Sequence, residues 1–477
     1  MIRALWRDGV VYAAGTLLSR GVALLLLPLV TRVLSPSEYG AMDLIVTLGV
    51  LVNLLVPLET SQALARFWND RAEGAPRRRL AGTAWTFTLA SHTAFAGACA
   101  LFAVPIALAL LGDAGYAPAV RAGGCAIALN GAFYLLQNQF RWELRPRAYA
   151  AVSVGYALAN LVFVAVFAWG LGAGLEGVLW AQAVAAAGAS ALSLGWLWRS
   201  LAWGIVRDEL AAMLRFSLPL VPAGIALFAS FYVNRLMLNA LATLHDVGMF
   251  GIASRLAGVA TLVLIGVQWA LTPLVYAHHH EAETPARLAR LLEGFSAVAL
   301  LACLALGLFG AELVLLLATP DYAKAAPLIG WLAVAAVLAQ LYIFAPGIAI
   351  ARKTHWQLAI TLVSAFAGVC LNALLIPRWG VWGATLATLV AGAVFFGAWM
   401  TVSQRLYPLP LRTGPLAAAA ALFVVLSLTS PQIDSGIPPG ALRGLVKAGE
   451  LLLFTWALGA LGLIRPRDWR HALATAN

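Results

Sequence analysis

The chain has 477 residues, of which 62% are hydrophobic and only 11% are charged, and its mean hydropathy is +0.87. Polar surface could not cover so much apolar side chain in water, which excludes a soluble globular protein. The net charge of +11 is spread over short loops between apolar runs, so no surface is left for a nucleic-acid-binding patch.

Apolar runs long enough for a helix to cross a bilayer recur along the whole chain. The first run, residues 10–33, is too long for the core of a signal peptide, so we expect it to remain as a helix. We therefore predict an all-α polytopic membrane protein with about 14 transmembrane helices. The expected spans are 10–33, 41–64, 82–111, 118–140, 148–171, 177–197, 216–241, 249–276, 294–318, 326–350, 357–376, 381–403, 413–430 and 444–464.

Most of the 31 lysines and arginines lie in every second loop, which predicts that both termini are cytoplasmic and that the number of spans is even. Related segments also recur six spans apart. Residues 38–40, Glu-Tyr-Gly, open the second span and residues 246–248, Asp-Val-Gly, open the eighth; Tyr-Ala opens the fourth at residue 116 and the tenth at residue 322. An even offset gives both halves one orientation, as in a parallel repeat about an axis along the membrane normal.

The repeat predicts three parts: an N-terminal lobe at 1–210, a C-terminal lobe at 211–407, and two further helices with a cytoplasmic tail at 408–477. Residues 29–40, Leu-Val-Thr-Arg-Val-Leu-Ser-Pro-Ser-Glu-Tyr-Gly, together with Asn234-Arg235 and residues 372–384, carry a family resemblance. Over roughly residues 10–405 the chain resembles the polysaccharide transporters of the MOP (multidrug/oligosaccharidyl-lipid/polysaccharide) exporter superfamily, the Wzx-type flippases.

This resemblance implies two six-helix lobes related by a pseudo-two-fold axis around a central cavity. It implies a transporter, not an enzyme, that moves an undecaprenyl-diphosphate-linked oligosaccharide between leaflets of a bacterial inner membrane by alternating access. The product would be O-antigen, exopolysaccharide or capsule. The expected partners are this lipid-linked oligosaccharide, membrane lipids, a polysaccharide polymerase and a chain-length regulator. No cofactor is expected, and the sequence has no Gly-rich phosphate loop for ATP.

Charged residues inside apolar spans are costly and are therefore candidates for function. Arginine suits a diphosphate because its planar fork donates two parallel hydrogen bonds. The alternative is a structural arginine that pairs with a carboxylate or with carbonyl oxygens, or, near a span end, one that reaches water. The candidate substrate-binding residues are Arg20, Arg235, Arg255 and Arg32.

Two acidic residues in the second span, Glu59 and Asp43, are candidates for ion coupling, with a fixed counter-ion role as the alternative. Glu450 in the last span could pair with Lys447 on the same helix face. No metal site is expected, because the histidines at 278–280 are consecutive and lie in a predicted solvated loop. Six amides in spans could bond neighbouring helices or sugar hydroxyls: Asn53, Gln62, Asn130, Gln137, Asn160 and Asn372.

Three other functions stay open at this point. A lipid II flippase or a drug/cation antiporter would belong to the same superfamily, although buried arginines favour an anionic substrate over a cationic drug. A membrane glycosyltransferase or polymerase acting on the same lipid would need a sizeable loop with paired acids. The predicted loops are too short for such a domain.

Overall fold

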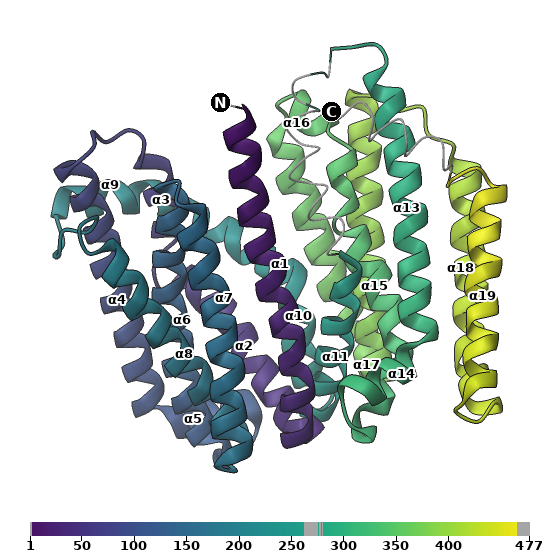
Figure 1. The fold of residues 1–477 in the computed structure, drawn as a ribbon, viewed down its shortest axis with the longest axis horizontal. Coiled ribbons are helices and arrows are strands. Elements are labelled where there is room, and N and C mark those ends of the chain that lie inside the picture. Colours follow the sequence, from purple (N-terminus) through teal and green to yellow (C-terminus); the bar gives the residue numbers. More distant parts are fainter. Residues whose placement is uncertain (1, 262–274, 276–277, 279, 465–477) are drawn as a thin grey trace. The chain divides into compact units, whose positions relative to one another are not determined.

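The computed structural model of this chain describes residues 2–261, 275, 278 and 280–464. These residues form helices joined by short turns, and no strand occurs among them (Figure 1). The chain forms two compact units, Met1–Gly248 and Met249–Asn477. The predicted three-part division at 1–210, 211–407 and 408–477 follows the sequence repeat and stays a prediction.

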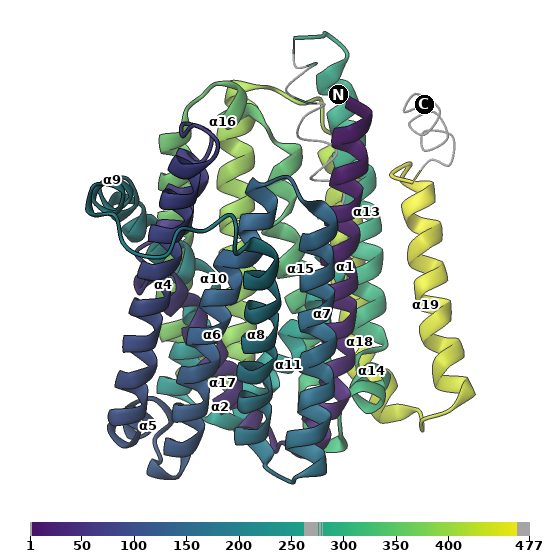
Figure 2. The ribbon, with the colours of Figure 1, turned by 60° about the vertical axis from the view of Figure 1, so that its left-hand side comes forward.

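Within the first unit, neighbouring helices follow the order α4, α6, α8, α7, α1 (Figure 2). The second helix, α2, begins with a capping box in which the backbone N–H of Ser35 donates to the Glu38 carboxylate at 2.8 Å. The helices are α1 (Ile2–Val33), α2 (Pro36–Leu55), α3 (Thr60–Phe67), α4 (Ala75–Leu101), α5 (Ala103–Leu111), α6 (Ala117–Trp142), α7 (Pro146–Val164), α8 (Gly174–Leu197), α9 (Arg207–Ser217), α10 (Val221–Leu241) and α11 (Leu244–Ala257), the last of which crosses the unit boundary.

Within the second unit, α17 contacts α15, α15 contacts α13, and α13 contacts both α18 and α19, which form a hairpin (Figure 1). The carboxylate of Glu293 on α13 accepts hydrogen bonds from Arg412, just before α18. The helices are α13 (Thr284–Leu308), α14 (Gly310–Leu317), α15 (Ile329–Leu338), α16 (Gly347–Ile350), α17 (Thr354–Leu406), α18 (Thr413–Gly436) and α19 (Ala441–Ala460).

The protein is a multi-pass integral membrane protein. Among the described residues, ten helical segments are long and apolar enough to cross a membrane, or eleven if α4 and α5 count as one. The 53 residues of α17 would extend about 80 Å, far more than a bilayer core. Gly380, with φ 52° and ψ −128°, breaks α17 between the predicted spans 357–376 and 381–403. Most of the predicted span 249–276 lies outside the described residues.

One predicted span has a different course. The predicted span 82–111 corresponds to two helices, α4 and α5, that meet at 82°. The backbone leaves the helical conformation at Phe102, with φ −104° and ψ 25°, and Pro105 in the first turn of α5 has no N–H to continue the α4 ladder. The predicted span 82–111 is therefore sharply bent, and it counts as one span only if α4 and α5 are taken together.

Three glycines let α6 approach two other helices of the first unit closely. A Cβ atom on Gly123 would lie 2.5 Å from the Ile45 side chain of α2, and one on Gly124 would lie 2.5 Å from Cys99 of α4. At Gly131 an added Cβ would lie 2.1 Å from Nε2 of His92. Helices in lipid gain stability mainly from such close contact, because burial from lipid adds no hydrophobic driving force.

The starts of α2 and α11 contact each other through two further glycines. A Cβ atom on Gly40 would lie 2.0 Å from the carbonyl oxygen of Leu244, and one on Gly248 would lie 2.0 Å from that of Pro36. The sequence repeat makes Gly40 and Gly248 equivalent positions. The fold therefore places two repeat-related glycines in one reciprocal contact, where each helix start accommodates the backbone of the other.

We expect Gly40→Ala and Gly248→Ala each to lower the melting temperature in detergent, because a methyl group would displace a backbone carbonyl that cannot rotate away. Overpacking of this kind costs about 1–3 kcal/mol. The matched control is Gly188→Ala in α8, where an added Cβ would have no atom within 4 Å apart from the backbone of its own helix, and alanine is the better helix former. Equal melting temperatures for Gly40→Ala and Gly188→Ala would contradict this description of the crossing.

Candidate functional site

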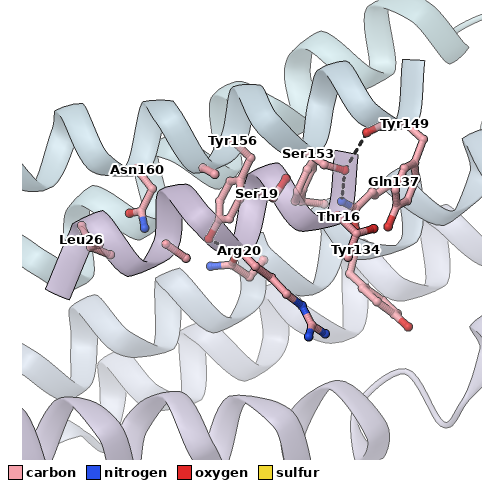
Figure 3. Close-up of a pocket in the computed structure, with 14 residues that line it drawn as sticks. Thr16, Ser19, Arg20, Leu26, Tyr134, Gln137, Tyr149, Ser153, Tyr156 and Asn160 are labelled. Carbon is pink, nitrogen blue, oxygen red and sulfur yellow. Dashed lines mark hydrogen bonds between the residues drawn. The ribbon is translucent and has the colours of Figure 1, made fainter. Parts of the chain in front are cut away.

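A cavity of about 330 Å³ lies between α1, α6 and α7 of the first unit (Figure 3). Helix α1 contributes Thr16, Ser19 and Arg20, whereas α6 and α7 contribute amides, hydroxyls and aromatic rings. Its volume is near the lower end of the range for small-molecule sites, roughly 300–1,000 Å³. The further lining residues are Ala23, Leu26, Asn130, Phe133, Tyr134, Gln137, Tyr149, Ser153, Tyr156, Ala157 and Asn160.

Hydrogen bonds between α6 and α7 fix the polar wall of this cavity. The Tyr156 hydroxyl donates to Oδ1 of Asn130 at 2.7 Å, and Nε2 of Gln137 donates to the Ser153 hydroxyl at 2.6 Å. Ser153 in turn donates to the carbonyl oxygen of Tyr149 at 2.6 Å. The expected interhelical role is thus confirmed for Asn130 and Gln137. The Asn372 amide instead donates to a carbonyl of its own helix, at Gly368.

Two polar groups of the cavity lack partners in the described part of the chain. Arg20 makes no hydrogen bond or ion pair there, and its guanidinium extends to the same side of α1 as Tyr134 (Figure 3). None of the described residues that line the cavity has a carboxylate. The Oδ1 atom of Asn160 is buried and accepts no hydrogen bond from a described residue. The cavity therefore offers one positive charge and one unused acceptor.

The sequence did not single out the aromatic and hydroxyl residues of this cavity. Tyr149, Ser153 and Tyr156 follow each other at intervals of three or four along α7, so they share one helix face with Asn160, which the sequence did single out. That spacing is the signal that could have identified them. A polar stripe inside an apolar span must face other helices or a cavity rather than lipid.

Asp43 and Arg235 form a buried ion pair between α2 and α10. Nε of Arg235 donates to Oδ2 of Asp43 at 2.7 Å, and the two side chains are 14% and 6% exposed. The guanidinium also lies 5.9 Å from the ring centre of Tyr232. The structure thus pairs Arg235, a candidate for substrate binding, with Asp43, a candidate for ion coupling. An ion pair of this kind is the structural role that the sequence offered as the alternative for each residue.

Glu59 lies at the break between α2 and α3, where Leu58 and Glu59 both have positive φ values of 50° and 55°. Such conformations are strained for residues with a Cβ and occur often at functional sites. The half-buried carboxylate makes no hydrogen bond or ion pair with a described residue, and it lies beside Gly224 of α10. Unlike Asp43, Glu59 has no fixed counter-ion among the residues that the structure describes.

The remaining arginine candidates do not line the cavity. Arg32 is exposed in the last turn of α1, and Arg255 is half-buried in the last turn of α11. Of the four predicted substrate-binding arginines, Arg20 therefore lines this cavity, and the other three are not among its described lining residues.

A second cluster of charges lies at the α18–α19 hairpin. Nζ of Lys447, which is fully buried, lies 2.8 Å from both oxygens of Glu312 and 2.6 Å from Oδ1 of Asp434. Glu450 instead contacts the hydroxyl of Thr429 at 2.8 Å. The predicted pairing of Glu450 with Lys447 is wrong, because two carboxylates outside α19 enclose the ammonium group.

Comparison with known proteins gives a family and a fold. The family described as polysaccharide biosynthesis protein matches residues 5–279. No curated protein matches this chain. Among solved structures, the lipid II flippase MurJ in an inward closed conformation has a TM-score of 0.67 and 11% sequence identity, over 96% of this chain and 100% of that chain.

Two other solved structures have the same fold. An inward-facing multidrug resistance MATE family transporter of the MOP superfamily has a TM-score of 0.64 and 17% identity, over 81% of this chain and 95% of that chain. A MOP superfamily transporter from Pyrococcus furiosus has a TM-score of 0.55 and 17% identity, over 84% of this chain and 96% of that chain. The family and the fold are those of transporters rather than enzymes.

We expect Asp43→Asn to destabilise the protein by about 3–5 kcal/mol, because it leaves the Arg235 charge buried without its partner. Thermal unfolding in detergent measures this, with Asp70→Asn in the exposed Arg66–Asp70 ion pair as the matched control. The double variant Asp43→Leu/Arg235→Leu should recover most of the lost stability. Additive losses from the two single leucine variants would show that the pair is not coupled.

Proposed function

This chain belongs to the polysaccharide biosynthesis protein family, and from that membership and its fold we propose that it is a flippase for undecaprenyl-diphosphate-linked oligosaccharides. It moves this lipid from the cytoplasmic to the periplasmic leaflet of a bacterial inner membrane by alternating access. The oligosaccharide then serves O-antigen, exopolysaccharide or capsule synthesis, where a polymerase and a chain-length regulator act on it.

The observation that carries this proposal is the uncompensated charge of Arg20. A cation in a membrane-spanning helix is costly without a counter-charge, and no described residue supplies one in the cavity. A diphosphate supplies two negative groups, and the planar guanidinium can bind them through parallel hydrogen bonds. Arg20 is thus the primary diphosphate ligand of the proposed mechanism.

The other arginines take later roles in the same mechanism. Arg235 exchanges its Asp43 partner for the diphosphate as the lipid passes, and Arg255 and Arg32 add positive charge along the route. Glu59 is the proposed coupling residue, because its carboxylate has no cation partner among the described residues whereas Asp43 is held by Arg235. In this mechanism Glu59 binds and releases a proton as the backbone at the α2–α3 break changes between the two conformations of the transporter.

The proposed topology has fourteen spans with both termini in the cytoplasm. The ten candidate spans become twelve when α4 and α5 form one bent span and α17 divides at Gly380. Helix α19 and the predicted span 249–276 complete the set. The clustering of arginines supports this orientation, because arginine-rich loops face the cytoplasm. The arginine-rich segments around α3 and α9 lie together at one end of the first unit (Figure 1), where Arg71 donates to Glu209 at 2.8 Å.

A lipid II flippase is the second candidate, because the MurJ structure covers nearly all of this chain and its substrate is also a lipid. A drug/cation antiporter is less well supported, since the cavity holds a cation and no carboxylate. Lipid II and a cationic dye are therefore the comparison substrates in transport assays.

We expect Arg20→Ala to slow flipping of a fluorescent undecaprenyl-diphosphate glycan at least about tenfold in proteoliposomes, the effect of losing a charge-assisted hydrogen bond. Arg20→Lys should be intermediate, because it keeps the charge and loses the planar fork. Arg199→Ala, an exposed arginine after α8, is the matched control. A folded Arg20→Ala protein that flips at the native rate would show that Arg20 is not the diphosphate ligand.

We expect an imposed pH gradient to change the flipping rate of the native protein and to have no effect on Glu59→Gln, because glutamine cannot take up a proton. The measurement is the initial rate in the same vesicles with and without the gradient. Glu176→Gln, at an exposed carboxylate on α8, should respond as the native protein does. If Glu59→Gln still responds fully, the coupling group lies elsewhere.

A further inference from the structure

The segment between α8 and α9, residues 201–206, is not helical and lies against the first turns of α4. The backbone N–H of Ala202 donates to the carbonyl oxygen of Arg78 at 2.9 Å. The backbone N–H of Val206 donates to the Thr83 hydroxyl at 3.1 Å. Helix α9 continues beside the same end of α4 (Figure 2). The segment is thus fixed at the end of α4 where the arginines of this helix are followed by its apolar run.

Apolar side chains of this segment are exposed. Trp203 and Ile205 are 67% and 44% exposed, although the neighbouring backbone is hydrogen-bonded to α4. Non-helical backbone at the lipid-facing surface is not tolerated in the hydrocarbon region, which places the segment at the level of the headgroups. Tryptophan is enriched at that level, because its ring is apolar and its N–H can bond to headgroups or water. Trp203 is therefore positioned to insert beside lipid headgroups.

Three arginines lie next to this segment. Arg78 and Arg79 are near the start of α4, Arg207 begins α9, and all three are exposed. None of their side chains makes a hydrogen bond or an ion pair with a described residue. Thr83, which accepts the hydrogen bond from Val206, lies one turn after Arg79, so Arg79 and Arg207 are close in space. We call these three arginines the basic patch.

Other arginines at this end of the first unit have carboxylate partners. Arg71 lies 2.8 Å from Glu209, and Arg77 lies 3.2 Å from Glu73. Asp208 is exposed next to the basic patch, and its carboxylate offsets one of the positive charges there. The basic patch therefore keeps a net positive charge at the membrane surface.

Acidic phospholipids match both features of this surface. Arginines near a membrane attract anionic headgroups, and the guanidinium fork binds a phosphate through parallel hydrogen bonds. The exposed ring of Trp203 adds contact with the apolar region just below the headgroup. We infer that the basic patch and Trp203 form a binding site for the headgroup of an acidic phospholipid in the surrounding leaflet. This inference does not depend on which lipid the protein transports.

The experiment titrates the purified protein in a neutral detergent with fluorescent phosphatidylglycerol. Phosphatidylcholine, which carries a phosphate but no net charge, and undecaprenyl phosphate are the comparison lipids. The key variant is the triple substitution Arg78→Gln/Arg79→Gln/Arg207→Gln. The charge-matched control removes three other exposed arginines, on α6, α13 and α17: Arg121→Gln/Arg290→Gln/Arg405→Gln.

We expect the triple variant to bind phosphatidylglycerol at least about tenfold more weakly than the native protein, since each arginine near an acidic surface contributes about fivefold. The charge-matched control should keep the native affinity. Added salt should weaken phosphatidylglycerol binding to the native protein, because the basic patch is exposed and its charge is screened.

Two single variants test the same surface in other ways. Asp208→Asn should bind phosphatidylglycerol about fivefold more tightly, because it removes a negative charge beside the basic patch. Trp203→Ser should weaken the binding of phosphatidylglycerol and phosphatidylcholine alike, because the contact of the ring does not depend on charge. Melting temperatures in detergent check that each variant is folded.

Several outcomes would overturn the inference. A folded triple variant could keep the native affinity for phosphatidylglycerol, or the charge-matched control could lose as much. Equal binding of phosphatidylglycerol and phosphatidylcholine by the native protein would show that the surface does not select charge. Weaker binding of undecaprenyl phosphate alone in the triple variant would assign the basic patch to a different lipid. If the triple variant does not fold, an unchanged affinity in Asp208→Asn refutes the site.

Discussion

A charge in an apolar environment needs a counter-charge, and this requirement organises the structure. Lys447 is fully buried because Glu312 and Asp434 surround its ammonium group, and Arg235 is buried because Asp43 pairs with it. Two of these ion pairs, Arg235–Asp43 and Lys447–Glu312, join helices that are distant in the sequence. Arg20 is exposed and has no such partner in the described chain, and our proposal assigns its counter-charge to the ligand.

Much of the fold followed from the sequence. The length and apolar character of the spans are local properties, and most predicted spans correspond to observed helices. The repeat related Gly40 to Gly248, and the structure places these glycines against each other's helix. The break at Gly380 was also readable, because Pro377-Arg378-Trp379-Gly380 interrupts the apolar pattern before it resumes.

The remaining features depend on contacts that no local pattern contains. Asp43 and Arg235 are 192 positions apart, so the sequence offered both as functional candidates without showing that they neutralise each other. Lys447 looked like a partner for Glu450 on the same helix, but tertiary packing supplied other carboxylates. The cavity itself was not predictable, since it needs the register of α1 against α6 and α7.

The reciprocal glycine contact also limits how the two halves of the protein can diverge. If the halves arose from one duplicated segment, most of their residues could have changed independently. Gly40 and Gly248 could not, because each leaves space for a backbone carbonyl of the opposite repeat, and no smaller residue exists to compensate for a substitution. The contact thus keeps the same residue at equivalent positions of the two repeats, although the sequences around these positions differ.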